Sequence, residues 1–154
     1  MNTIGFDAVT PADMEELAAL RILAMRDSLE RIGRFDPDRA RSRFVDGFDP
    51  ANTKIILADG ERVGFVVARR EHGEIQLDHL YILPGHQRRG IGSAVMAELL
   101  SDADAKGLTA TVGALRGSEA NAFYQRFGFK PAGESEWDLF YRRPPALPAG
   151  PPPA

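Results

Sequence analysis

The segment that joins a predicted strand to a predicted helix constrains the fold of this chain more than any other. Strand-forming residues over 75–83 lead through a short loop with two arginines and two glycines into a helix over 90–105. Apolar residues recur along that helix at helical spacing: Ile91, Val95, Leu99 and Leu100. Lys106-Gly107 provides the expected helix end. A strand and a helix joined this closely indicate a sheet with helices packed on it.

The other elements follow from caps, turns and apolar spacing. A capping sequence at Thr10 predicts a helix that ends near Ser28, Asp36-Pro37 predicts the start of a second helix, and Asp59-Gly60 is typical of a hairpin turn. The predicted strands cover residues 4–9, 54–58, 63–69, 75–83, 108–114, 129–132 and 137–141, and a last helix covers 118–128. The order β-α-α-β-β-β-α-β-α-β-β predicts an α/β protein (an α+β sandwich), with a mixed sheet and helices on both faces.

The composition is that of one soluble domain. The chain has 154 residues, of which 44% are apolar and 27% charged, and it contains no cysteine, which excludes disulfides, thiolate zinc sites and a cysteine nucleophile. A net charge of −3 argues against nucleic acid as the main partner. No leader and no apolar run of membrane-spanning length is visible, so we expect a cytoplasmic protein without a membrane partner.

The C-terminus is rich in proline. Six of the 11 prolines fall in residues 144–154, a segment with little to offer a core. We therefore predict a disordered tail over 144–154 and a single folded domain over 1–143.

The chemistry of the strand-to-helix loop is that of a phosphate site. Backbone N–H groups at a helix N-terminus lack intrahelical acceptors and attract negative charge. Gly90 and Gly92 let a ligand approach the backbone, and Arg88 and Arg89 add positive charge. The loop is not a Walker A sequence, and Val95 stands where a dinucleotide-binding loop has its third glycine. The residues alone therefore predict a phosphate or pyrophosphate cradle, with an ordinary basic turn as the alternative.

A second motif lies near the C-terminus. Residues 121–131 read Asn-Ala-Phe-Tyr-Gln-Arg-Phe-Gly-Phe-Lys-Pro, a short helix that ends at glycine and leads into a strand. Taken alone, Tyr124 is better explained as a core tyrosine with a satisfied hydroxyl group than as a catalytic residue.

Together the two motifs resemble the GNAT superfamily of acetyl-CoA-dependent N-acetyltransferases. The matching segments are Gln87-Arg88-Arg89-Gly90-Ile91-Gly92 and Phe123-Tyr124-Gln125-Arg126-Phe127-Gly128-Phe129, and the likeness covers residues 3–143. It implies a GNAT-like, mostly antiparallel seven-stranded sheet. The second motif looks especially like that of the arylalkylamine acetyltransferases, although the acceptor-binding segments show no comparable match.

The resemblance also implies roles for individual residues. The backbone around Tyr81 would pair with the pantetheine arm of the donor, the glycine loop would hold its pyrophosphate, and Tyr124 would protonate the departing thiolate. The implied donor-binding residues are Leu80, Tyr81, Ile82, Gln87, Arg88, Arg89, Gly90, Ile91, Gly92, Ser93 and Asn121. Many family members carry an asparagine seven residues before this tyrosine. Gly117 stands there in this chain, and Asn121 is a partial replacement.

The identity of the general base is also open. Several family members use Glu or His on the strand before the cradle, at positions that hold neither residue here. Those positions lie on the face that carries Gln76 and Asp78, so Asp78 is the predicted base, acting directly or through water. His79 has the better intrinsic pKa but lies on the opposite, apolar face, where a core histidine bonded to backbone is the alternative.

The predicted function is transfer of an acetyl group from acetyl-CoA to a primary amine by direct attack in a ternary complex. The alternatives are a catalytically silent acyl-CoA-binding sensor or partner domain and a nucleotide-binding module. The acceptor stays open between small molecules and peptides because acidic and basic residues interleave over residues 27–46. No metal site is visible, and a homodimer stays open.

Overall fold

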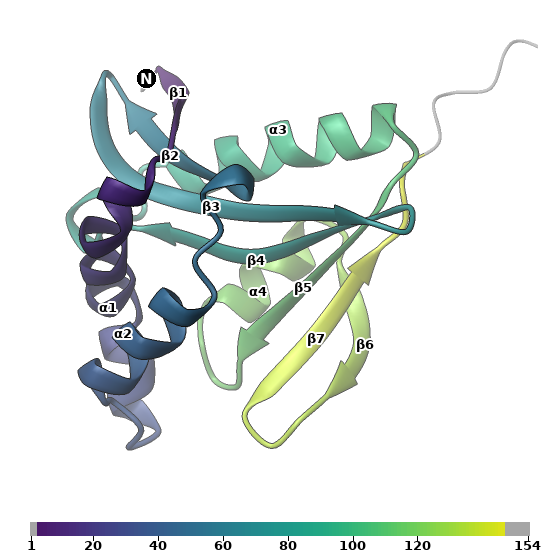
Figure 1. The fold of residues 1–154 in the computed structure, drawn as a ribbon. Coiled ribbons are helices and arrows are strands. Elements are labelled where there is room, and N and C mark those ends of the chain that lie inside the picture. The colour runs from purple at the N-terminus through teal and green to yellow at the C-terminus, as the bar shows by residue number, and fades with distance from the viewer. Residues whose placement is uncertain (1–2, 147–154) are drawn as a thin grey trace, which may run out of the picture. The chain divides into compact units, whose positions relative to one another are not determined.

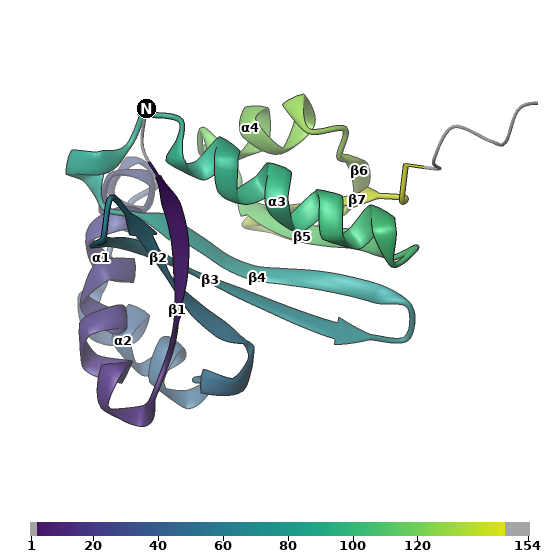
Figure 2. The ribbon, with the colours of Figure 1, turned by 90° about the horizontal axis from the view of Figure 1, so that it is seen from above.

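The computed structural model describes residues 3–146, which form two compact units. The first comprises residues 3–68 and 78–95, and the second comprises residues 69–77 and 96–146. Hydrogen bonding joins seven strands in the order β1-β2-β3-β4-β5-β7-β6, with β1 at one edge (Figure 2). Four α-helices accompany them. The mixed, mostly antiparallel seven-stranded sheet and the predicted order of elements are therefore confirmed.

The first unit is built on an antiparallel meander. β1 (Ile4–Ala8) pairs with β2 (Thr53–Ala58), which pairs with β3 (Glu61–Glu71). The turn between β2 and β3 places Asp59 and Gly60 at φ values of 52° and 84°, as a two-residue hairpin requires. The register shifts between Ile56 and Leu57, so β3 carries one extra residue opposite that step.

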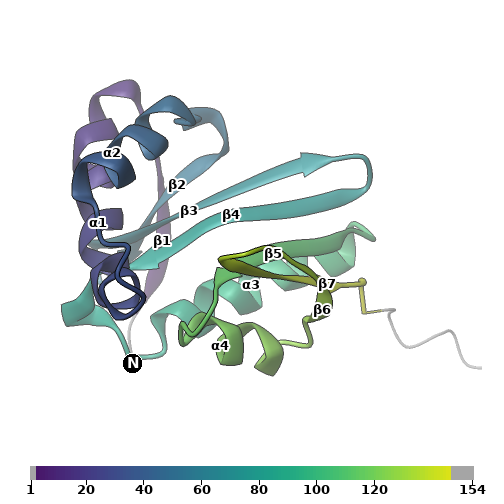
Figure 3. The ribbon, with the colours of Figure 1, turned by 90° about the horizontal axis from the view of Figure 1, so that it is seen from below.

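Two helices cover one face of this meander. α1 (Met14–Arg31) and α2 (Pro37–Asp46) lie side by side (Figures 1 and 3). Their apolar faces meet those of β2 and β3 in one core cluster: Leu17, Ala18, Leu20, Phe44, Ile55, Phe65 and Val67. The sequence explains part of this, because Leu17 and Leu20 are three residues apart on α1 and Phe65 and Val67 are two apart on β3, so each pair shares one face of its element.

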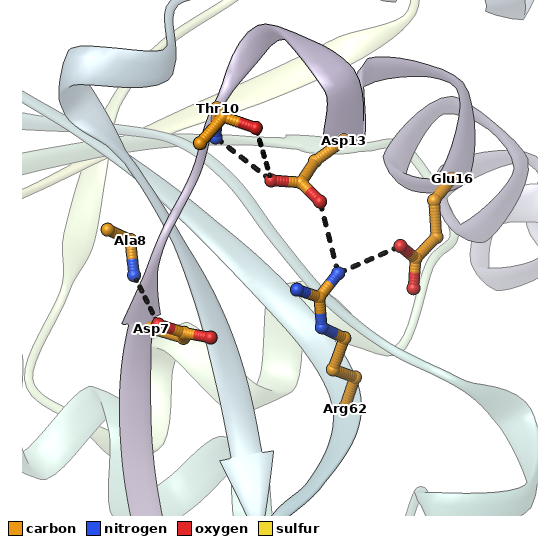
Figure 4. Close-up of polar contacts among 6 residues, drawn as sticks. All are labelled: Asp7, Ala8, Thr10, Asp13, Glu16 and Arg62. Carbon is orange, nitrogen blue, oxygen red and sulfur yellow. Dashed lines mark hydrogen bonds and ion pairs between the residues drawn. The ribbon is translucent and has the colours of Figure 1, made fainter.

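The start of α1 is fixed by polar contacts (Figure 4). The Thr10 N–H donates to Asp13 Oδ2 at 2.9 Å, and Arg62 of β3 donates to Asp13 Oδ1 at 3.1 Å and to Glu16 at 2.9 Å. The Thr10 N–H and the Arg62 guanidinium hold the pKa of the Asp13 carboxyl group below its ordinary value. Residues Pro11–Asp13 form a 3₁₀ turn, so the α-helix begins at Met14 and runs to Arg31, beyond the predicted end near Ser28.

The strand-to-helix connection follows in sequence. β4 (Glu74–Ile82) leads through a 3₁₀ turn at Pro84–His86 into α3 (Ile91–Ala105), as predicted. The first four residues of β4 belong to the second unit, where they pair in parallel with β5 (Thr109–Leu115).

The second unit continues from β5. α4 (Ala120–Arg126) packs beside β5, and β7 (Asp138–Arg143) pairs antiparallel with both β5 and β6 (Lys130–Glu134) (Figure 1). Tyr124, Phe129 and Tyr141 pack in its core. α4 begins at Ala120 with Glu119 as its N-cap, one residue after the predicted cap Ser118.

An ion pair joins the end of α3 to the end of β7. Arg143 donates to both carboxylate oxygens of Asp104, at 2.8 and 3.1 Å, and to the carbonyl oxygen of Phe127. The Arg143 guanidinium is the main reason that the pKa of Asp104 lies below its ordinary value. The Ala146 N–H also donates to Asp104. The rest of the predicted tail, residues 147–154, lies outside the described residues. Over residues 3–146, no helix is long and apolar enough to cross a membrane.

Candidate functional site

The predicted cradle lies in the first unit, where the end of β4 turns into α3. The Leu83 N–H donates to the Val63 carbonyl oxygen at 2.8 Å, which ties the start of the loop to β3. The side chain of Gln87 donates through Nε2 to the carbonyl oxygen of Ile82 at 2.9 Å. Gln87, a member of the predicted donor-binding set, thus bridges the two ends of the turn.

The backbone of this loop has two residues at positive φ, as the backbone of an anion-binding nest does. Arg88 has a φ of 63° and Gly90 a φ of 79°, whereas the φ of Arg89 between them is not positive. Alternation of left- and right-handed residues turns successive N–H groups toward one side, where they form a concave anion site. Arg88 adopts the left-handed region although it is not glycine, a costly conformation that is concentrated at functional sites.

The first turn of α3 continues the nest. The Ala94 N–H donates to the Gly90 carbonyl oxygen at 3.0 Å and so makes the first hydrogen bond of the helix. By helix geometry, the preceding N–H groups of Ile91, Gly92 and Ser93 have no intrahelical acceptor. A Cβ atom at Gly90 would meet nothing within 4 Å, so the surface above the loop is open. The exposed arginines Arg88 and Arg89 and these N–H groups fit a phosphate-bearing ligand.

The two candidate bases lie on opposite faces of β4. Asp78 is half-buried and shares its face with Gln76 and Leu80. His79 lies in an aromatic cluster, with its ring centre 5.9 Å from that of Phe44 and 5.5 Å from that of Tyr81. His79 Nδ1 and the Tyr81 hydroxyl oxygen are 3.3 Å apart, within hydrogen-bond distance. His79 therefore packs against the core, as expected of a core histidine. Its contact with Tyr81 is to a side chain, whereas the sequence led us to expect a bond to the backbone.

One residue near this site was missed in the sequence. A Cβ atom at Gly64 of β3 would lie only 2.1 Å from the carbonyl oxygen of Tyr81 and 3.2 Å from the Cα atom of Ile82. Glycine is therefore required at this position, because the backbone of β4 passes directly against β3 where the donor is predicted to pair. An isolated glycine within a predicted strand was the available signal, since it marks a bulge or a close backbone approach.

The second unit carries the predicted acid. Tyr124 of α4 is 7% exposed, and its ring packs against those of Phe123, Phe129 and Tyr141 at centroid distances of 5.6, 5.7 and 6.4 Å. The ring is thus held rigidly in the core of this unit, as a positioned catalytic group or a structural tyrosine would be.

Asn121, one turn before Tyr124, is bonded within the protein. Its Nδ2 donates to the carbonyl oxygens of Leu115 and Ser118 at 2.9 and 3.0 Å, and its Oδ1 accepts from the Tyr141 hydroxyl at 2.8 Å. These bonds join the end of β5, the start of α4 and β7. Gly117, where many family members carry asparagine, has a φ of 79°, a conformation that glycine and asparagine adopt most readily.

No group of three or more His, Asp or Glu side chains is gathered as a metal site within residues 3–146.

Comparison with known proteins identifies the class. Residues 51–131, just over half of the chain, match the family described as "Acetyltransferase (GNAT) domain". The chain is 31% identical to the N-acetyltransferase Rv2669 of Mycobacterium tuberculosis over 136 residues, which cover 77% of this chain and 83% of that protein. It is 24% identical to the N-acetyltransferase YafP of Escherichia coli over 137 residues, which cover 84% and 83%.

The fold is also found among solved structures. The PaiA N-acetyltransferase of Thermoplasma acidophilum, solved in complex with coenzyme A, aligns with a TM-score of 0.75 at 16% identity, over 92% of this chain and 99% of that chain. The protein is thus an acyltransferase. More specifically, it belongs to the GNAT acetyltransferase family.

Proposed function

We propose that this protein transfers an acetyl group from acetyl-CoA to a primary amine by direct attack of the amine in a ternary complex. The observation that carries the proposal is the backbone nest at Arg88–Gly90, which opens onto the unsatisfied N–H groups of α3. Family membership supports acetyl transfer in general, and the coenzyme A bound to the Thermoplasma protein supports the donor.

The donor would be held by the loop. The N–H groups of Ile91, Gly92 and Ser93 face the position where pyrophosphate would sit, and Arg88 and Arg89 would neutralise part of its charge. The end of β4, from Leu80 to Ile82, would offer backbone groups to the pantetheine arm, as an added strand does. Acetyl-CoA supplies a thioester whose carbonyl carbon is open to attack by an amine.

Two side chains would handle protons. Asp78 is the proposed base that accepts a proton from the ammonium group of the acceptor, directly or through water, so that the free amine can attack the thioester carbonyl carbon. Tyr124 is the proposed acid that protonates the departing thiolate. A phenol has a pKa near ~10 and keeps its proton at neutral pH. It is therefore available to donate that proton as the thiolate forms, the conjugate base of a thiol with a pKa near ~8.5.

The donor site is tested by Gly92→Asp, which places bulk and negative charge at the cradle. We expect the dissociation constant for acetyl-CoA, measured by calorimetry, to rise by well over tenfold, which corresponds to about 1.4 kcal/mol.

Gly85→Asp is the matched control. Gly85 lies in the same loop but outside the nest, and a Cβ atom there would meet nothing within 4 Å. Its added charge should be screened by solvent and change the affinity by less than about threefold. Equal affinity in folded Gly92→Asp and wild-type protein would remove this loop from the donor site.

A further inference from the structure

Arg21 is an arginine on α1 whose charge has no anionic partner within the described residues. The side chain is half-buried, and its Nη1 donates to the carbonyl oxygen of Ala40 on α2 at 2.8 Å. Its Nε is buried and has no hydrogen-bond partner. No carboxylate lies within ion-pair distance of it in the part of the chain that the structure describes.

This arrangement differs from that of neighbouring arginines. Arg26, one turn further along α1, pairs with Glu30 at 2.9 Å, and Arg41 on α2 pairs with Glu15. The α1 residues three and four positions from Arg21 are all apolar: Leu17, Ala18, Ala24 and Met25. Burying part of a charge without an anionic partner is costly, so a ligand that supplied a negative charge here would stabilise the side chain.

Arg21 is bonded to α2 one helical turn before Phe44, which packs against the aromatic residues of β4. Leu17 precedes it by one turn of α1, and Phe44 follows Ala40 by one turn of α2; both belong to the core cluster of this unit. The ring of Phe44 is 5.9 Å from that of His79, the neighbour of Asp78 on β4. The helix to which Arg21 is bonded therefore contacts, through Phe44, the strand that carries the proposed base.

The donors that remain on Arg21 have a defined shape. Nη1 is bonded to Ala40, and the edge formed by Nε and Nη2 has no acceptor among residues 3–146. In general, an edge of two parallel N–H groups can bind a carboxylate through both oxygens; in this structure the Nε atom of that edge is buried. One guanidinium supplies one positive charge, which matches a carboxylate better than a phosphate group of nearly two negative charges.

We propose that the acceptor is a primary amine that also carries a carboxylate group, and that Arg21 binds this carboxylate. The inference rests on the proposed acetyl transfer to an amine and adds the second functional group of the acceptor. The amine end reaches β4 while the carboxylate stays between α1 and α2.

The test compares matched pairs of compounds. The probes are unbranched ω-amino carboxylic acids of increasing length, the primary amides of the same acids, and the corresponding aminoalkyl phosphates. Binding is measured by calorimetry with and without coenzyme A, so the result does not depend on turnover. Initial rates with acetyl-CoA are measured separately. The proteins are the wild type, Arg21→Gln, Arg21→Lys and, as the control, Arg26→Gln on the same helix.

We expect the wild type to bind at least one acid about tenfold or more tightly than its amide, as loss of a charged hydrogen-bonded pair predicts. Arg21→Gln should bind that acid and its amide within about twofold of each other, because a neutral side chain of similar length no longer distinguishes them. Arg21→Lys should keep part of the preference, and Arg26→Gln should keep all of it.

Three results would overturn the proposal. The first is a wild type that prefers no acid to its amide, a result that stands even if Arg21→Gln fails to fold. The second is an equal loss for acid and amide in Arg21→Gln, which would make Arg21 only a link between two helices. The third is tighter binding of a phosphate than of every carboxylate. The rates give a separate test. If the protein acetylates the amides as fast as the acids, the role of Arg21 is refuted and acetyl transfer is not. If it binds the acids selectively but transfers no acetyl group, only the proposed function is refuted.

Discussion

At the scale of single residues, the fold holds two candidate catalytic side chains in place by packing. Tyr124 packs against the rings of Phe123, Phe129 and Tyr141, and His79 packs against Phe44 and Tyr81. Such packing fixes a ring without deciding whether its polar atom reacts. Substitutions that change the polar atom alone are therefore the informative ones.

Tyr124→Phe removes one hydroxyl group and leaves the ring contacts in place. If Tyr124 is the acid, turnover should fall by about 10²–10⁴, because the thiolate must leave without a positioned proton donor. Affinity for acetyl-CoA and the melting temperature should change little. Wild-type turnover in this variant, under conditions where chemistry limits the rate, would identify Tyr124 as a core residue only.

Asp78→Asn keeps the size of the side chain but cannot accept a proton near neutral pH. The rate should fall strongly near pH ~7, and the deficit should shrink as rising pH deprotonates the amine itself. His79→Gln is the matched control on the opposite face of β4, and its effect should appear in the melting temperature, because it removes a ring from an aromatic cluster. An active Asp78→Asn beside a stable but inactive His79→Gln would assign the base to the other face, and two active variants would assign it to solvent.

Among single residues, those that act through local backbone chemistry could be predicted from the sequence. Gly90 has the positive φ that a glycine in a tight loop allows, and Arg88 lies beside it in the nest. For Gly64 the sequence offered only the general signal of an isolated glycine in a predicted strand, and for Arg21 it offered none. The close Tyr81 carbonyl at Gly64 and the lack of a carboxylate near Arg21 within residues 3–146 depend on parts of the chain distant in sequence.

At the scale of elements, the joint between β4 and α3 is the proposed donor site and was the most predictable part of the chain. Strong apolar periodicity marks both sides of it, and its loop residues have defined turn chemistry. The 3₁₀ turns at Pro11–Asp13 and Pro84–His86 and the register shift at Ile56 and Leu57 were not predicted. They depend on capping geometry and on strand pairing, which a single stretch of sequence does not specify.

The far end of α3 gives a prediction about pH. The pKa of Asp104 is lowered in the folded protein, chiefly by its hydrogen bonds to Arg143. A lowered pKa stabilises the fold at pH values above the carboxyl group's ordinary pKa of 3.8, and this contribution is lost as the pH falls through the folded value. Asp104→Asn should therefore reduce the free energy of unfolding by about 1 kcal/mol at neutral pH and by progressively less in acid.

The control for the Asp104–Arg143 ion pair is Asp102→Asn. Asp102 lies on the same helix as Asp104, and its exposed carboxylate pairs with Lys106. Urea unfolding of both variants and the wild type should show a change below about 0.5 kcal/mol for Asp102→Asn at every pH. A loss at Asp104 that does not depend on pH would show that the charge of the carboxylate contributes nothing.

At the scale of the whole molecule, the order of strands and the family agree with what two short motifs predicted. The sheet is mixed and seven-stranded, and the GNAT match over residues 51–131 identifies acyl transfer as the class of activity. The acceptor could not be predicted, because it depends on how the side chains of α1 and α2 are paired in three dimensions. Of these side chains, Arg21 gives the most specific indication.

The central claim is that this protein joins the acetyl group of acetyl-CoA to an amine. The most direct measurement incubates the protein with acetyl-CoA and a panel of primary amines, follows the release of free thiol, and identifies the product by mass. The account predicts that thiol is released only when an amine is present and that an equal amount of acetylated amine is formed. Tight binding of acetyl-CoA with no thiol release for any amine in the panel would contradict it and would identify a silent acyl-CoA-binding domain.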